Sequence, residues 1–305
     1  MSLTNKENHG TQNKNGASIN NNASVACSFS FYDYGSWAVV TGTTDGIRKA
    51  LVFELTSKGL NLGLISWNPS KLEATSSELR DRFGATTEVH HIVKTGVADL
   101  MKLSGEEIAA AIARATEGID VGLLVNNAGL AYPYPRCFHE VDRELMESML
   151  RVNVNAALWA TKGVIDGTLK RKRGAILNSG SGSSVCIPSF PLLTLYASTK
   201  AFMAMFSRSI DLEYKEAGID IQCQVPPFIA TKMIMLRRRL MLVPSPEMFS
   251  RASVRWIGYE RQCNPYWLHA VQGFVIRATD AFTIWYGQRY LKWMRQEGLE
   301  HDGLL

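Results

Sequence analysis

Short apolar runs alternate with longer amphipathic segments along most of this chain. The runs are rich in aliphatic and β-branched residues, which is typical of strands buried on both faces of a parallel sheet. They predict six strands, over residues 37–41, 61–66, 89–93, 121–125, 174–178 and 220–225. Between the runs, apolar residues recur every three or four positions, as Ile47, Leu51 and Leu55 do, and this spacing predicts helices.

The later helical patterns cover about 142–169, with a break near 153–155, and 196–217. Regular alternation of strands and helices implies right-handed crossovers, and therefore an α/β fold with a doubly wound parallel sheet. Ligands of such folds bind beyond the carboxyl ends of the strands. The residues that follow each predicted strand are therefore the candidates for chemistry.

The two ends of the chain depart from this pattern. Residues 1–30 predict a disordered polar tail, because the stretch up to Ser24 carries too little apolar surface to offset the entropy of ordering. The tail lacks the regions of a signal peptide, and no run of about 18 apolar residues predicts a membrane-spanning helix. The apolar segment 266–290 is interrupted by charges and predicts a packed helix pair, with contact with a membrane surface as the alternative.

Composition narrows the functional classes. The chain has 305 residues, 46% of them hydrophobic and 20% charged, which suits one large domain or two small ones. These values exclude a disordered, collagen-like or disulfide-framework protein. A net charge of +5 is compatible with an acidic ligand and falls short of a nucleic-acid-binding surface. Five widely spaced cysteines without a CxxC pair indicate reduced thiols and predict no metal site.

A glycine-containing turn follows the first predicted strand. Glycines at such a turn allow backbone amides and the positive end of the next helix to approach a diphosphate. The candidate cofactor-binding residues in this turn are Gly42, Thr44, Asp45, Gly46 and Ile47. Glycine-rich turns also follow strands for purely conformational reasons, so the turn alone leaves both interpretations open.

A second candidate follows the fourth predicted strand, where the sequence reads Asn-Asn-Ala-Gly from residue 126 to 129. Asn side chains at this position tie neighbouring strands together, and a small Ala-Gly pair leaves room for a ligand. Asn127, Ala128 and Gly129 are therefore candidate cofactor-binding residues. The alternative is an Asx turn, which needs no ligand.

Ser181, Tyr196 and Lys200 form the third candidate. The spacing of four residues places Tyr196 and Lys200 on the same face of one predicted helix. An ammonium group near a phenol favours the phenolate and lowers the pKa of the tyrosine, which suits proton transfer to or from a substrate oxygen. A serine hydroxyl nearby holds that oxygen in place.

Together these motifs resemble the short-chain dehydrogenase/reductase family, in which TGxxxGI, NNAG, a serine and YxxxK follow in this order. The resemblance implies one Rossmann-like domain over residues 31–305, with a C-terminal helical extension from about residue 232. It also implies a nicotinamide cofactor. Tyr196 would be the catalytic acid or base, and Lys200 would bind the nicotinamide ribose and tune Tyr196.

The resemblance assigns further positions. Asn153 matches the asparagine that anchors a proton-relay water. Ser181 matches the substrate-positioning serine by its local motif, whereas the usual spacing to the tyrosine selects Ser183; we prefer Ser181 and keep Ser183 open. The segment from Pro226 resembles the PGxxxT motif beside the nicotinamide and adds two cofactor-binding candidates, Ile229 and Thr231.

A narrower resemblance is to the plant very-long-chain 3-oxoacyl-CoA reductases and, less closely, to the animal 17β-hydroxysteroid dehydrogenase type 12 relatives. Tyr34–Gly42, Phe138–Asp142 and Arg255–Glu260 carry it. It implies NADPH-dependent reduction of a 3-oxoacyl-CoA in very-long-chain fatty-acid elongation, with an acyl-CoA as ligand and other elongase components as partners. A homodimer is also expected, and no nucleic acid. The resemblance implies the cytosolic face of the endoplasmic reticulum; the missing amino-terminal anchor gives a cytoplasmic location as the alternative.

Three residues depart from the family pattern on the cofactor side. Arg48 stands where a third glycine is usual, Trp67 where an arginine for the 2′-phosphate of NADP is expected, and Thr95 where an aspartate near the adenine is expected. One hypothesis is that Arg48 supplies a replacement cation to the phosphates. Another is a catalytically impaired paralogue that acts through partner binding. A third keeps the reductase and changes the substrate to a steroid or another hydrophobic ketone.

Overall fold

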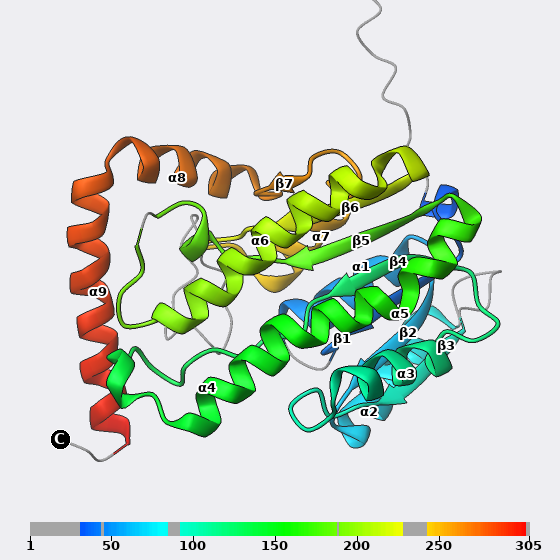
Figure 1. Ribbon diagram of the computed structural model, residues 1–305, viewed down its shortest axis with the longest axis horizontal. Helices are drawn as coiled ribbons and strands as arrows, with labels where there is room; N and C mark the ends of the chain where they lie inside the picture. Colours follow the sequence, from blue (N-terminus) through cyan, green and yellow to red (C-terminus); the bar gives the residue numbers. More distant parts are fainter. Residues whose placement is uncertain (1–30, 44–45, 85–91, 188, 228–242, 303–305) are drawn as a thin grey trace, which may run out of the picture.

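In the part of the chain that the structure describes, seven parallel strands form one central sheet (Figure 1). The structure is a computed structural model, and it describes residues 31–43, 46–84, 92–187, 189–227 and 243–302. The strands are β1 (Trp37–Thr41), β2 (Asn61–Ser66), β3 (Val93–Val97), β4 (Val121–Asn126), β5 (Gly174–Ser179), β6 (Ile219–Gln224) and β7 (Gln262–Cys263). Their spatial order is β3-β2-β1-β4-β5-β6-β7. This order confirms the predicted doubly wound, Rossmann-like sheet in a single domain.

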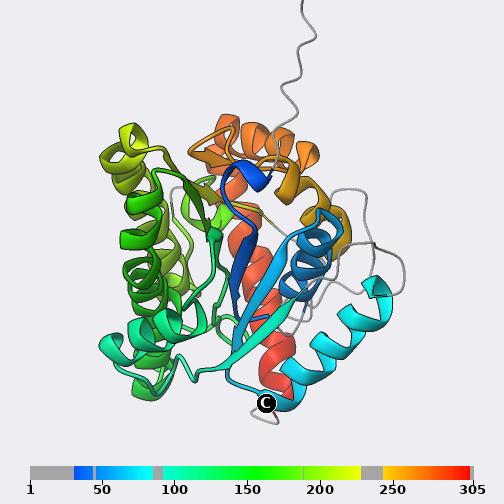
Figure 2. The same ribbon diagram turned by 90° about the vertical axis from the view of Figure 1, so that its right-hand side faces the viewer.

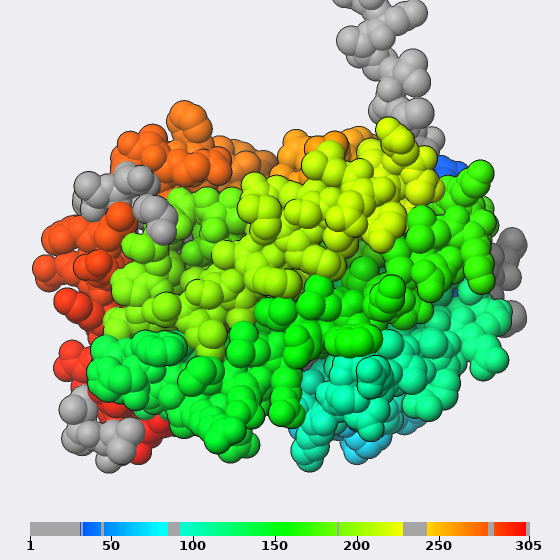
Figure 3. All heavy atoms as spheres, viewed as in Figure 1, coloured from blue at the N-terminus to red at the C-terminus, as the bar shows by residue number. Residues whose placement is uncertain are grey.

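Helices cover both faces of this sheet (Figure 2). They are α1 (Ile47–Ser57), α2 (Pro69–Phe83), α3 (Gly105–Ala115), α4 (Arg143–Leu150), α5 (Ala156–Arg171), α6 (Thr194–Tyr214), α7 (Pro246–Arg255), α8 (Trp267–Ala278) and α9 (Asp280–His301). α1, α2 and α7 pack on one face, and α3, α5 and α6 on the other. α8 and α9 lie along two margins of the molecule (Figure 3).

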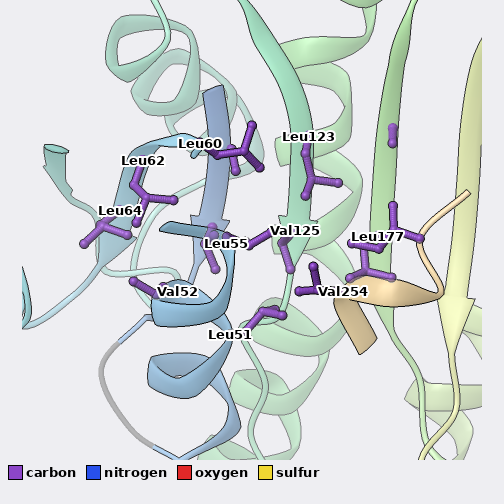
Figure 4. Packing of buried hydrophobic residues seen from close by; sticks show 14 of the residues in the cluster. Leu51, Val52, Leu55, Leu60, Leu62, Leu64, Leu123, Val125, Leu177 and Val254 are labelled. Carbon is purple, nitrogen blue, oxygen red and sulfur yellow. The ribbon is translucent and has the colours of Figure 1, made fainter. Parts of the chain in front are cut away.

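The buried face of α1 shows how the apolar spacing produces this packing. Leu51, Val52 and Leu55 are almost fully buried, and they lie against the leucines of β2 and the valines of the central strands (Figure 4). Fully burying one such side chain stabilises the fold by about 1.5–3 kcal/mol. The strands that these residues cover are buried along their whole length, which explains why they are visible as apolar runs.

The starts of two helices are specified locally. Asn68 caps α2 by accepting a hydrogen bond from the Lys71 N–H at 2.9 Å, and Pro69 occupies the first helical position. At α3, the Ser104 hydroxyl accepts from the Glu107 N–H while the Glu107 carboxylate accepts from the Ser104 N–H. Both helices therefore begin at capping residues that the local sequence supplies.

Two strands at the sheet edges differ from the prediction. β3 begins at Val93, where the predicted strand was to end, and residues 85–91 lie outside the described residues. β3 is an edge strand with largely exposed side chains, so apolar patterning does not mark it. β7 has only two residues, too few for any periodicity, and was not predicted.

The C-terminal helices form the expected pair, and large apolar side chains lie on their outer surface. On α8, Trp267, Val271 and Phe274 are exposed while His269 and Gly273 are buried. On α9, Trp285 and other aromatic residues are also exposed. Among the described residues, no helix is long and apolar enough to cross a membrane. The tail 1–30 and the proposed boundary near residue 232 lie outside the described residues.

A β-bulge interrupts the pairing of β1 with β4. Trp37 pairs with Val121 but Ala38 pairs with Leu123, so Gly122 is an extra residue on β4. A Cβ on Gly122 would lie 2.5 Å from the backbone nitrogen of Gly35. The two backbones thus approach each other at a distance that only glycine permits.

We expect Gly122→Ala to lower the free energy of unfolding by about 1–3 kcal/mol, because backbone atoms must move to admit the methyl group. The control is Gly287→Ala in the interior of α9, where an added Cβ meets no atom within 4 Å. It should raise stability by roughly 0.5–1 kcal/mol through helix propensity. Urea denaturation of the two variants measures both changes; equal effects would contradict the close approach.

Candidate active site

Buried polar side chains connect the carboxyl ends of β4 and β5. Asn126 Nδ2 donates to Asn178 Oδ1 at 2.9 Å and to the Thr161 hydroxyl of α5 at 3.0 Å. Asn178 Nδ2 donates in turn to the Ser207 hydroxyl of α6 at 2.8 Å. All four side chains are buried. These bonds fix α5 and α6 relative to the ends of the two strands.

The loop after β4 is also held from both sides. The Thr41 hydroxyl, at the end of β1, accepts the backbone N–H groups of Asn127 at 3.2 Å and Ala128 at 3.3 Å. The Asn127 side-chain oxygen accepts from the Ser179 hydroxyl of β5 at 2.7 Å. The asparagine side chains therefore reach other strands, as predicted for strand-tying residues, and this geometry favours that interpretation over an Asx turn.

The glycine-containing turn lies directly against this loop. Gly42 has φ 69°, and a Cβ there would lie 2.8 Å from Ala128 Cα, so both conformation and space require glycine. Gly46 caps α1, which begins at Ile47. Thr44 and Asp45 lie outside the described residues.

The chemistry of this turn fits the diphosphate of a dinucleotide. The amino-terminal end of α1, with its positive partial charge, follows this turn directly. Thr43 Oγ1 and Asn127 Nδ2 are buried and have no hydrogen-bond partner among the residues that the structure describes. Unpaired buried polar atoms are costly, so their presence here indicates a site built for a polar ligand.

Asn153 lies in a π-helical turn, Arg151–Asn155, between α4 and α5. The predicted break is thus a local widening of a continuous helix, in which the Ala156 N–H bonds to the Arg151 carbonyl. The Asn153 carboxamide accepts from the Leu130 N–H at 2.7 Å and donates to the Leu130 carbonyl at 2.8 Å. It also donates to the Thr199 hydroxyl at 3.0 Å. Asn153 therefore joins the loop after β4 to α6.

Tyr196 and Lys200 lie one turn apart on α6, as predicted, with Lys200 Nζ 5.9 Å from the centre of the Tyr196 ring. Lys200 is buried, and its Nζ donates to the Ser179 carbonyl at 2.9 Å. Burial and, to a smaller extent, the nearby charge of Arg48 lower the pKa of Lys200 to about 8. A Cβ on Gly129 would lie 3.6 Å from Lys200 Nζ, so the loop after β4 lies next to the ammonium group.

Ser181 contacts both Tyr196 and Ser183. Burial raises the pKa of the Tyr196 phenol, whereas a hydrogen bond with Ser181 and the charge of Arg48 lower it. The predicted lowering of this pKa by Lys200 is therefore not the dominant effect in the ligand-free site. The Ser181 oxygen accepts the Ser183 N–H at 3.2 Å and the Ser183 hydroxyl at 2.9 Å. The Ser181 hydroxyl therefore lies between Ser183, which donates to it, and the Tyr196 phenol.

One of the three departures on the cofactor side looks different in the structure. Thr95 lies in the middle of β3 with an exposed side chain, because the strand runs four residues beyond the predicted one. The residue two positions after the strand is Asp99, so the expectation that Thr95 replaces an aspartate is wrong: an aspartate is present there. Trp67 follows β2 and is exposed, as a residue at the rim of the sheet.

The sequence did not indicate which residues the Arg48 side chain contacts. Its Nη2 donates to the Gly129 carbonyl at 3.3 Å, so the side chain extends from α1 to the loop after β4. Its charge acts on Tyr196 and Lys200. Ile229 and Thr231 lie outside the described residues. Within the described residues, no group of three His, Cys, Asp or Glu side chains could hold a metal ion.

Comparison with known proteins matches residues 36–240 to the short chain dehydrogenases. A very-long-chain 3-oxoacyl-CoA reductase-like protein of Arabidopsis thaliana is 43% identical over 80% of this chain and 77% of its own length. The human very-long-chain 3-oxoacyl-CoA reductase is 36% identical over 79% and 75% of the two chains. A human protein named inactive hydroxysteroid dehydrogenase-like protein 1 is 38% identical over 78% and 71%.

Solved structures share the fold. A short-chain dehydrogenase from Sphingobium yanoikuyae in complex with NADPH is 26% identical, with a TM-score of 0.63 over 72% of this chain and 83% of that one. A 7β-hydroxysteroid dehydrogenase structure gives a TM-score of 0.72 over 87% and 98% at 21% identity, which supports the fold alone.

We expect Asn153→Ala to lower the free energy of unfolding by about 1–3 kcal/mol, because it leaves the Leu130 N–H and carbonyl without their side-chain partner. Asn155→Ala changes an exposed residue of the same π turn and should alter stability by less than about 0.5 kcal/mol. Thermal unfolding monitored by circular dichroism compares the two; equal losses would mean that the carboxamide bonds do not stabilise the loop.

Proposed function

The chain belongs to the short-chain dehydrogenase family of oxidoreductases, and on this basis we propose that it reduces a 3-oxoacyl-CoA to the 3-hydroxyacyl-CoA with NADPH, in very-long-chain fatty-acid elongation. The observation that carries the proposal is the convergence of Ser181, Tyr196 and Lys200 beside the ends of β4 and β5. The names of two relatives supply the substrate class.

The residues after β1 and β4 suit the proposed cofactor. Gly42, Gly46 and Ile47 would hold the diphosphate through their backbone groups. Asn127, Ala128 and Gly129 would line the nicotinamide half, and Tyr196 and Lys200 would bind its ribose. Thr44, Asp45, Ile229 and Thr231 are proposed as further contacts. When bound, NADPH supplies the hydride for the substrate carbonyl carbon.

The side chains of α6 and the β5 loop divide the remaining chemistry. Tyr196 donates its phenolic proton to the carbonyl oxygen, and its raised pKa keeps that proton in place at neutral pH. Ser181 donates a hydrogen bond to the same oxygen, while Ser183 holds Ser181 in position. Lys200 is largely charged at neutral pH, which favours transfer of the proton from Tyr196. Asn153 is proposed to hold the water that returns the proton to Tyr196.

A second candidate function is that of a catalytically impaired paralogue that acts by partner binding. The relative named inactive, at 38% identity, supports it, as does an exposed Trp67 where a cation for the 2′-phosphate is expected. Intact Asn153, Ser181, Tyr196 and Lys200 favour the reductase. Reduction of a steroid or another hydrophobic ketone would use the same groups.

The proposal includes location and partners. We propose the cytosolic face of the endoplasmic reticulum and association with other elongase components, because the chain resembles reductases of that pathway and its relatives carry their name. A homodimer is proposed as its oligomeric state.

We expect Tyr196→Phe to lower kcat/KM for a 3-oxoacyl-CoA by about 10²–10⁴-fold, because no proton donor remains at the oxygen. Ser181→Ala should cost about 100-fold, and Ser183→Ala less than about tenfold, since Ser183 acts through Ser181. NADPH oxidation followed by absorbance measures all three. A larger loss for Ser183→Ala would assign the positioning role to Ser183. Equal inactivity of wild type and Tyr196→Phe, with NADPH bound, would favour the second candidate function.

The pH profile of kcat/KM for NADPH reports ionisations of the free enzyme. Lys200 is protonated below a pKa of about 8, so we expect a plateau below pH 8 and a tenfold fall per pH unit above it. Arg48→Gln removes a positive charge that lowers the pKa of Lys200, and should therefore move the falling limb to higher pH. A limb that stays in place or moves to lower pH would contradict this electrostatic effect.

A further inference from the structure

Arg48 connects the two segments between which the proposed dinucleotide would lie. It is the second residue of α1, at the helix end that faces the glycine-containing turn. Its guanidinium donates to the carbonyl of Gly129, on the loop after β4. The same two segments approach closely at Gly42 and Ala128. The partly buried Arg48 side chain therefore extends across the cofactor side of the site towards the loop after β4.

The charge of Arg48 acts within the site. It lowers the pKa of Tyr196 and of Lys200, both on α6. The next residue, Lys49, instead forms an ion pair with Glu78 of α2 on the outer surface. The two neighbouring cations of α1 thus point to different sides of the helix. Arg48 lies near Tyr196 and Lys200, whereas Lys49 lies on the outer surface.

The bond from Arg48 to the Gly129 carbonyl is weaker than a bond to a phosphate would be. At 3.3 Å, the bond to the Gly129 carbonyl lies beyond the usual range for N–H···O bonds, and its acceptor is neutral. A guanidinium binds phosphate oxygens with two parallel charge-assisted bonds, which are shorter and about twice as strong. A phosphate would therefore bind this guanidinium more strongly than the Gly129 carbonyl does.

We propose that Arg48 is a cofactor-binding residue that releases Gly129 and binds the diphosphate of the dinucleotide. This inference rests on the proposed function, because it requires a dinucleotide at the site. The diphosphate is the group expected at the amino-terminal end of α1, whereas the 2′-phosphate is recognised beyond β2, where Trp67 stands. Arg48 thus contributes equally to NADPH and NADH, which share the diphosphate.

Isothermal titration calorimetry of the full chain with NADPH and with NADH tests this assignment. Arg48→Gln should weaken both cofactors by the same factor, about 10- to 100-fold, as expected for the loss of a hydrogen bond to a charged group. Arg48→Lys should recover part of the loss. Lys49→Gln is the matched control, because it removes the same charge one residue further along, on the surface that faces Glu78, and should leave both affinities unchanged.

Three outcomes would overturn the inference. A loss confined to NADPH would place Arg48 on the 2′-phosphate, tighter binding by Arg48→Gln would make the side chain an obstruction, and unchanged binding would leave it structural. Thermal unfolding without cofactor checks that the variants are folded. A wild type that binds both cofactors but does not reduce 3-oxoacyl-CoA would overturn the proposed function and leave this assignment standing; a wild type that binds neither would overturn both.

Discussion

The site depends on a set of buried hydrogen bonds across the ends of β1, β4 and β5. In the low dielectric of the interior these bonds are strong, and an unpaired member would be costly. Asn126 and Asn178 bond to each other and to α5 and α6, so the network fixes strands and helices together. The Ser179 carbonyl of the same strand end holds Lys200. The position of the ammonium group is therefore set by the sheet and does not rely on a loop.

Much of this arrangement could be predicted from the sequence because the central strands are buried on both faces. Continuous apolar runs located β1, β2, β4 and β5, and the motifs that follow β1, β4 and β5 meet at one edge of the sheet. β3 was placed four residues too early, since an exposed edge strand lacks an apolar run. That shift alone made Thr95 look like a lost aspartate, whereas Asp99 holds the position. An error in one edge strand thus changed the interpretation of the cofactor site.

The contacts that could not be predicted depend on geometry at the scale of a single bond. Sequence spacing left Ser181 and Ser183 as alternatives, and in the structure Ser183 donates two hydrogen bonds to the Ser181 oxygen. The motif likewise presents Arg48 as a missing glycine. The structure shows that the Arg48 side chain reaches the loop after β4. Replacement of the usual glycine by arginine therefore adds a positive charge at this loop.

The π turn sets the length of the long helix that carries Asn153. Each residue of an α-helix turns the chain by about 100°, so the additional residue in the turn changes which way everything after it faces. Before the turn, Met149 packs among the loop residues around Tyr132; after it, Ala156 and Ala160 face the sheet. A chain one residue shorter here could form a regular helix, but one of these two surfaces would then point away from its partner. The number of residues in this turn therefore decides whether both surfaces meet their partners. In a relative that lacks one residue within 151–155, we expect that the asparagine no longer reaches α6.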